Sequence, residues 1–171
     1  ADKIIEKIKH STGLEIEIID GEKEAEIIYS NHIAEDLPSG KTYFYIDIGG
    51  GSVELTLFTN GNITSSRSFP VGTLRLLNHD VSHKTWMELK TWVKNTCGKH
   101  EAITAIGTGG NVTKIFKMVE NKKGKTICLK DIKKIHHELS MLTFNERIEK
   151  FSLNKDRADV IVPAGKIITS I

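Results

Sequence analysis

The stretch Asp47-Ile48-Gly49-Gly50-Gly51-Ser52-Val53-Glu54 decides the fold of this chain. Three consecutive glycines let the backbone turn tightly between two extended segments and leave amide groups open to a ligand. Successive amides of this kind form a concave anion site, and glycine lets a phosphate approach the backbone. Asp47 can hold a divalent cation, directly or through water. Ser52 and Glu54 lie two residues apart and share one face of the second segment. The stretch predicts a phosphate site beside two carboxylates, with a simple glycine hairpin as the alternative.

The segments that flank this stretch predict a three-stranded antiparallel sheet. Residues 43–48 are apolar, residues 53–59 alternate, and Asn60–Gly61 is a hairpin turn signal before a third strand at about 62–69. The later elements expected are helices at 72–78 and 82–98, a buried strand at 102–106, a helix at 111–120 and a mainly helical remainder over 130–171 that Pro163 interrupts. Antiparallel strands followed by a helical crossover and another strand indicate an α/β layered domain, a mixed sheet flanked by helices.

A second glycine loop, Gly107-Thr108-Gly109-Gly110, follows the fourth expected strand and opens a helix. The first turn of a helix offers unpaired N–H donors and a partial positive charge to an anion. One such helix end contributes about 0.3–1 kcal/mol to the binding of an anion. Taken singly, this loop is equally well explained as an ordinary left-handed turn. Two glycine loops from neighbouring strands, however, predict a clamp for phosphate.

The first forty residues follow a different pattern. The spacing of apolar residues predicts a helix over 2–11, a strand over Leu14–Ile18 and a second helix over 22–33. The polar stretch 35–41 contains both Pro and Gly, so it is the expected domain boundary, between 1–35 and 36–171. The charged, periodic N-terminal residues do not fit a signal peptide, and no initiator Met is present, so we expect a fragment.

Composition and charge exclude several classes of function. Hydrophobic residues make up 39% and charged residues 27% of the 171 residues, an ordinary globular balance. No run of 18 or more apolar residues is present, so no membrane span is expected. The net charge of +2 gives no strong field for an anionic polymer; phosphate has to be attracted by local amides, a metal ion and a few placed cations, and no nucleic-acid partner is expected. Cys97 and Cys128 are expected to be reduced thiols of a cytoplasmic protein.

Several segments carry a resemblance to a known family. The Asp47–Glu54 stretch and the second glycine loop are similar to the phosphate motifs of the superfamily of actin-like ATPases, sugar kinases and heat-shock chaperones. Three further segments narrow this to the exopolyphosphatase and guanosine pentaphosphate phosphohydrolase family. They resemble the end of its first domain, the segment after its third strand and its late helical signature, and are Thr12–Ala25, Pro70–Leu76 and Arg157–Gly165. The resemblance places nearly the whole chain in the C-terminal half of a two-domain catalytic core.

The resemblance implies an RNase H-like fold and an activity, the hydrolysis of the terminal phosphate of polyphosphate or guanosine pentaphosphate by metal-assisted, in-line attack of water. It implies that Glu24 is the catalytic glutamate that positions and deprotonates this water. Asp47 would bind Mg²⁺ or Mn²⁺, and Glu54 would assist as a second acid, on the metal or on the water. Residues 49–52 and 107–110 would hold the substrate phosphates. The resemblance also allows a homodimer.

The chain departs from the family pattern in three respects. Glu26 stands where the family usually has Arg, which removes a cation near the site, and Pro163-Ala164-Gly165 replaces a common Pro-Gly-Ala. The family's first domain, with its own phosphate motif, and the strand after the late helix are not found in the sequence. Because half of the phosphate donors belong to that first domain, we expect little activity from this chain without it. The first domain is therefore the expected partner.

Two alternatives use the same glycine loops. One is an ATP-binding module of the actin, chaperone or sugar-kinase type, which closes a cleft to change shape. The other is a non-catalytic sensor of the alarmone nucleotide, which the acidic Glu26 in place of a cation makes conceivable. The sequence does not distinguish polyphosphate from guanosine pentaphosphate as the preferred substrate.

Overall fold

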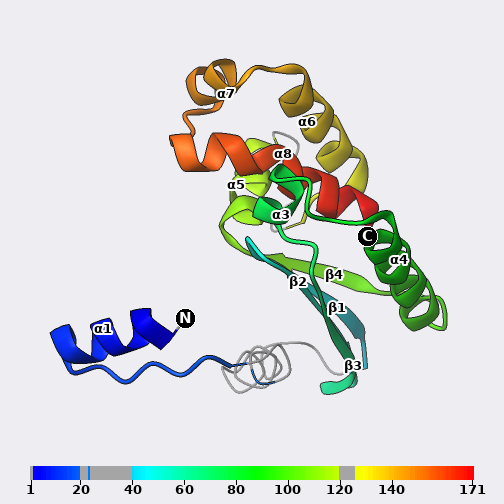
Figure 1. The fold of residues 1–171 in the computed structure, drawn as a ribbon. Coiled ribbons are helices and arrows are strands. Elements are labelled where there is room, and N and C mark those ends of the chain that lie inside the picture. The colour runs from blue at the N-terminus through cyan, green and yellow to red at the C-terminus, as the bar shows by residue number, and fades with distance from the viewer. Residues whose placement is uncertain (1, 20–22, 24–39, 120–125) are drawn as a thin grey trace.

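The computed structural model describes residues 2–19, 23, 40–119 and 126–171. Its centre is a mixed four-stranded sheet with the strand order β3-β2-β1-β4 (Figure 1). The strands are β1 (Thr42–Ile48), β2 (Val53–Thr59), β3 (Asn62–Phe69) and β4 (Thr104–Thr108). Strands β1, β2 and β3 pair antiparallel, whereas β4 pairs parallel to β1 after a helical crossover. The α/β layered fold and the mixed sheet predicted from the sequence are confirmed.

Local signals explain why these strands form. Asn60 and Gly61 both have positive φ angles, 53° and 80°, as a two-residue hairpin between β2 and β3 requires. Strand β1 is buried along most of its length, so its apolar run is a central strand. The register places Asp47 of β1 directly opposite Glu54 of β2. The hairpin therefore fixes which residues face each other at the end of the sheet that carries the first glycine loop.

Helices build the rest of the described structure and form two apolar cores. They are α1 (Asp2–Thr12), α3 (Thr73–Leu77), α4 (His83–Cys97), α5 (Gly110–Met118), α6 (Leu129–Met141), α7 (Phe144–Phe151) and α8 (Lys155–Ser170). In the first core, one sheet face packs against Leu89 of α4 and Ile167 of α8. In the second, Ile115 of α5, Leu139 of α6 and Ile161 of α8 pack together, in the upper part of Figure 1. Among the described residues, no helix is long and apolar enough to cross a membrane.

Three predictions about secondary structure were wrong. Residues 14–18 form no strand, and Leu14 and Ile18 are each 63% exposed, because alternation makes a strand only where a neighbouring strand pairs with it. Strand β4 begins at Thr104 and is mostly exposed, since it pairs only with β1 at the sheet edge. Pro163 lies inside α8 and does not interrupt it, because buried residues on both sides hold the helix in place. The helix predicted over 22–33 and most of the boundary 35–41 fall outside the described residues.

Helices α6 and α8 pack closely at Gly165, where a Cβ atom would lie 2.5 Å from His136 Nδ1. This nitrogen is buried and has no hydrogen-bond partner. Burial lowers the pKa of the His136 imidazole, and the positive charges of His137 and Lys166 act in the same direction. The folded protein therefore holds this imidazole in its neutral form.

We predict that the free energy of unfolding falls as the pH falls below about 6.5, the ordinary pKa of histidine. The unfolded chain then binds a proton that folded His136 resists, at a slope of at most about 1.4 kcal/mol per pH unit for one group. Urea unfolding of His136→Asn at pH 7.5 and 5.5 should show a smaller loss than wild type, whereas His10→Asn on exposed α1 should lose as much as wild type. An unchanged loss in His136→Asn would contradict this assignment.

Candidate functional site

The first glycine loop joins β1 to β2 and presents free amides. Gly49 N donates to Ser52 O at 3.0 Å and closes the turn. Within the part of the chain that the structure describes, the amides of Gly50, Gly51 and Ser52 donate no hydrogen bond. All three residues are partly or fully exposed. Three successive unpaired donors on a glycine turn can bind an anion such as phosphate.

Two carboxylates stand at the base of this loop. Asp47 and Glu54 are direct cross-strand partners, so their Cβ atoms lie about 4.5–5.5 Å apart on one face of the sheet. Glu54 Oε1 accepts hydrogen bonds from Ser52 Oγ at 2.5 Å and from Ser68 Oγ at 3.0 Å. The prediction that Ser52 and Glu54 share a face is confirmed. The two hydroxyls hold one Glu54 oxygen and leave the other available to a ligand.

The second glycine loop meets the first at Asp47. Because β4 runs parallel to β1, Thr108 pairs with Asp47 and both strands end at the same edge. A Cβ atom on Gly109 would lie 2.8 Å from Ile48 O and 3.5 Å from Asp47 Oδ1. Gly109 has a φ of 101° and is the N-cap of α5, so the start of this helix is turned toward the same point. The structure thus brings the second loop next to Asp47, and the joint phosphate site of the two loops stays a prediction.

Tyr45 and Thr108 line the sheet next to the carboxylates. Burial is the main cause of a raised pKa of the Tyr45 hydroxyl; the Asp47 charge raises it further, and the nearby Thr108 hydroxyl lowers it. Thr108 Oγ1 is itself buried without a hydrogen bond of good geometry. Tyr45 therefore stays a neutral phenol at physiological pH, next to the buried Thr108 hydroxyl.

Sequence reasoning missed one cation, Arg157 in the first turn of α8. A Cβ atom on Gly110 would lie 3.2 Å from Arg157 Nη2, so the guanidinium covers the second glycine loop. In the sequence, Arg157 stands out only as the first residue of the segment that resembles the family's late helical signature. Nothing in its spacing indicates contact with a loop 47 positions earlier (157 − 110). Arg157 therefore places a positive charge next to the second glycine loop.

The candidate metal ligands are few. Glu24 lies outside the described residues, so the structure does not place the expected catalytic glutamate. Among the described residues no group of three or more His, Cys, Asp or Glu side chains could enclose a metal ion. Asp47 and Glu54 nevertheless fit Mg²⁺, which is usually bound through one or two carboxylates, water and substrate phosphate rather than by a full protein cage. Asp47 and Glu54 are the residues that would hold such an ion, which would supply positive charge beside the glycine loops.

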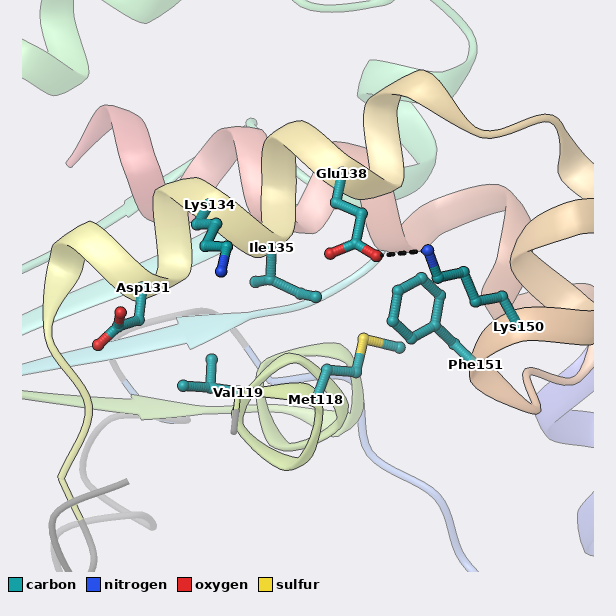
Figure 2. A pocket seen from close by; sticks show the side chains of 8 residues that line it. All are labelled: Met118, Val119, Asp131, Lys134, Ile135, Glu138, Lys150 and Phe151. Atoms are coloured by element: carbon teal, nitrogen blue, oxygen red, sulfur yellow. Dashed lines mark ion pairs between the residues drawn. The ribbon is translucent and has the colours of Figure 1, made fainter. Parts of the chain in front are cut away.

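A separate pocket of about 440 Å³ lies between α5, α6 and α7 (Figure 2). Its walls include Met118 at the end of α5 and the ion pair of Glu138 with Lys150, 2.8 Å apart. Met118 lies eight residues along α5 from Gly110, about 12 Å of helix axis. The pocket is therefore distinct from the glycine loops.

The sheet order and the helices around it define a layered α/β domain, a fold that solved structures of a Ppx/GppA protein and of an exopolyphosphatase share. A model of the Ppx/GppA phosphatase family matches residues 1–171, so the chain belongs to this family. The family expected from the sequence is thereby confirmed.

Comparison with individual proteins agrees with this assignment. A bifunctional 3-dehydroquinate synthase/phosphatase of Fusobacterium nucleatum is 28% identical over an alignment 190 residues long. This alignment covers 99% of this chain and 29% of that protein. The structure of an exopolyphosphatase from Cytophaga hutchinsonii superposes with a TM-score of 0.76 at 22% identity, over 99% of this chain and 61% of the other. A Ppx/GppA family member from Aquifex aeolicus gives 0.69 at 22% identity, over 99% and 60%. The chain thus spans about three fifths of these solved structures and less than a third of the curated relative.

Proposed function

We propose that this chain forms part of an enzyme that removes the terminal phosphate of polyphosphate or guanosine pentaphosphate. The observation that supports this most is the meeting of two glycine loops at Asp47, where a Cβ atom on Gly109 would lie 3.5 Å from the carboxylate. The second loop lies against the end of the strand that leads into the first loop, which supports one shared site for a chain of phosphates. Membership of a phosphatase family favours hydrolysis over a purely structural use of the loops.

The described residues bind and neutralise the substrate in this proposal. The free amides of residues 50–52 and the start of α5 hold phosphate oxygens. Arg157 supplies the cation beside the second loop. Asp47 and Glu54 would hold Mg²⁺, which would supply positive charge to neutralise the phosphate oxygens. Phosphoryl transfer depends almost entirely on such positioning and charge stabilisation.

The attacking water needs a base, and we assign this role to Glu24. A carboxylate within hydrogen-bond reach of the water can orient it in line with the terminal phosphorus and accept its proton. Glu54 is less suited to be the base, because one of its oxygens already accepts two hydrogen bonds, from Ser52 and Ser68. We therefore place Glu54 on the metal, beside Asp47.

The test is phosphate release by the protein that contains both domains, with polyphosphate and guanosine pentaphosphate as substrates and with Mg²⁺ or EDTA present. We expect release from at least one substrate, dependent on Mg²⁺, and far less from residues 1–171 alone. Equilibrium binding of ATP is the matched control. Absence of release from both substrates together with adenine-dependent ATP binding would favour an ATP-binding module. Alarmone binding without release would favour a sensor.

A further inference from the structure

One short segment holds the carbonyls of the three glycines of the first loop. Thr73 N and Thr73 Oγ1 donate to Gly49 O at 3.0 and 3.3 Å, Leu74 N and Arg75 N donate to Gly50 O at 2.9 and 3.4 Å, and Arg75 Nε donates to Gly51 O at 2.9 Å. All of these donors belong to the first turn of α3. The loop is therefore tied to α3 on its carbonyl side at three successive peptide groups.

The contact is also too close for a side chain at its centre. Gly72 is buried, and a Cβ atom there would overlap the backbone of Gly50 and Gly51. Gly72 has a φ of −98°, which any residue can adopt, so glycine is needed here for close approach and not for backbone freedom. Thr73 beside it is only 3% exposed. The contact between the loop and α3 is thus buried and tightly packed.

This arrangement fixes where the amides point. A trans peptide group is planar, so the C=O of one residue and the N–H of the next point in opposite directions. Holding the carbonyls of residues 49, 50 and 51 against α3 therefore turns the amides of residues 50, 51 and 52 away from it. Those are the amides that donate no hydrogen bond in the described structure. The first turn of α3 thus orients the N–H groups of residues 50–52 away from the helix.

Arg75 makes a separate contribution. The carbonyls of Gly49 and Gly50 accept hydrogen bonds from the backbone amides of residues 73–75. Among substitutions of these donor residues, only proline removes the amide hydrogen. The Gly51 carbonyl accepts from the Arg75 guanidinium, so only this anchor depends on a charged side chain. A charge-assisted bond to a carbonyl also polarises the peptide and strengthens its N–H as a donor. The affected N–H is that of Ser52, at the end of the loop nearest Glu54.

We propose that Arg75 is a positioning residue, which aligns the Ser52 amide toward substrate phosphate from the opposite side of the Gly51–Ser52 peptide. The proposal rests on the phosphate-binding role of the loop proposed above. Arg75 is exposed, but its bond to Gly51 O places the guanidinium behind the amide and not in front of it. Its effect thus passes through the backbone, and geometry matters more than charge.

The kinetic test compares Arg75→Ala, Arg75→Lys and Arg67→Ala in the two-domain protein with Mg²⁺. We expect Arg75→Ala to lower kcat by about 10–100-fold, less than the loss of a complete oxyanion donor, with a smaller change in KM. Arg75→Lys should recover little, because an ammonium does not reproduce the planar Nε–H donor. Arg67 stacks on Phe69, with its guanidinium carbon 4.7 Å from the ring centroid, and is not among the donors to the loop carbonyls, so Arg67→Ala should leave kcat unchanged. Full activity in Arg75→Lys or in Arg75→Ala would overturn the proposal.

A second readout needs no turnover and separates this inference from the proposed function. In ¹H–¹⁵N spectra without substrate, the Ser52 amide should shift in both Arg75 variants, while the Leu57 amide in the middle of β2 should not. Urea unfolding should stay near that of wild type, because Arg75 is exposed. A shifted Ser52 amide in a protein that releases no phosphate would retain the positioning role and reject the hydrolase. An unmoved Ser52 amide would reject the positioning role whatever the activity.

Discussion

Replacing Gly109 with alanine is expected to destabilise the protein by about 2–5 kcal/mol, the combined effect of a strained backbone and an overpacked contact. Gly109 has φ 101° and ψ 152°, a region that side chains rarely enter. The added Cβ would also lie 2.8 Å from Ile48 O, a backbone atom in the central strand that has little freedom to move. Both penalties act where β1 and the second loop meet, so the distance between the two glycine loops has to increase.

The same substitution should lower phosphate release in the two-domain protein, because the two loops then no longer converge on one phosphate chain. Gly110→Ala is the matched control for stability. Its Cβ would meet only Arg157 Nη2, at 3.2 Å, and the end of a flexible side chain can shift. Urea unfolding should place Gly110→Ala within about 1 kcal/mol of wild type, the scale of a glycine-to-alanine change in a helix. Equal stability of Gly109→Ala and Gly110→Ala would mean that the close approach of the loops is incorrect.

The sequence predicts the sheet well because the signals for it are local. A hairpin dipeptide at Asn60–Gly61, alternation in β2 and a glycine triplet between strands each act within a few residues. The parallel pairing of β4 with β1 follows from a helical crossover, which leaves few topologies open. These features suffice to bring Asp47, Glu54 and both glycine loops to the same end of the sheet, where β1 and β4 finish.

The contacts that complete the site could not be predicted, because they join residues far apart in sequence. Residues 49–51 can pack against α3 because residue 72 is a glycine. In the sequence, nothing distinguishes Gly72 from an ordinary loop glycine. Arg157 reaches Gly110 only because α5 and α8 pack in one core. Residues 14–18 show the converse error, where a strand-like pattern lacks a partner strand in the described structure. Periodicity indicates which side of a helix or strand is apolar, but it does not indicate which residues that side contacts.

Glu24→Gln should produce the largest loss of activity, a fall in turnover on the order of 10²–10⁴ in the two-domain protein, the usual contribution of a general base. Glutamine keeps the size of the side chain and can still hydrogen-bond the water, but it cannot accept the proton. Substrate binding should change little, since the phosphates are assigned to the glycine loops, Arg157 and the metal on Asp47. The expected result is therefore a large effect on kcat with a small one on KM.

The pH dependence distinguishes a lost base from a disturbed fold. If Glu24 is the base, the acidic limb of the kcat/KM profile reports its ionisation, and this limb should be absent in Glu24→Gln. The control is Glu15→Gln: the Glu15 carboxylate is 80% exposed and, within the described residues, pairs with Lys9 at 2.7 Å, so both rate and profile should match wild type. Unchanged phosphate release in Glu24→Gln would remove Glu24 from the mechanism. Glu54, the other carboxylate beside the loops, would then have to accept the proton through its second oxygen, next to the oxygen that Ser52 and Ser68 hold.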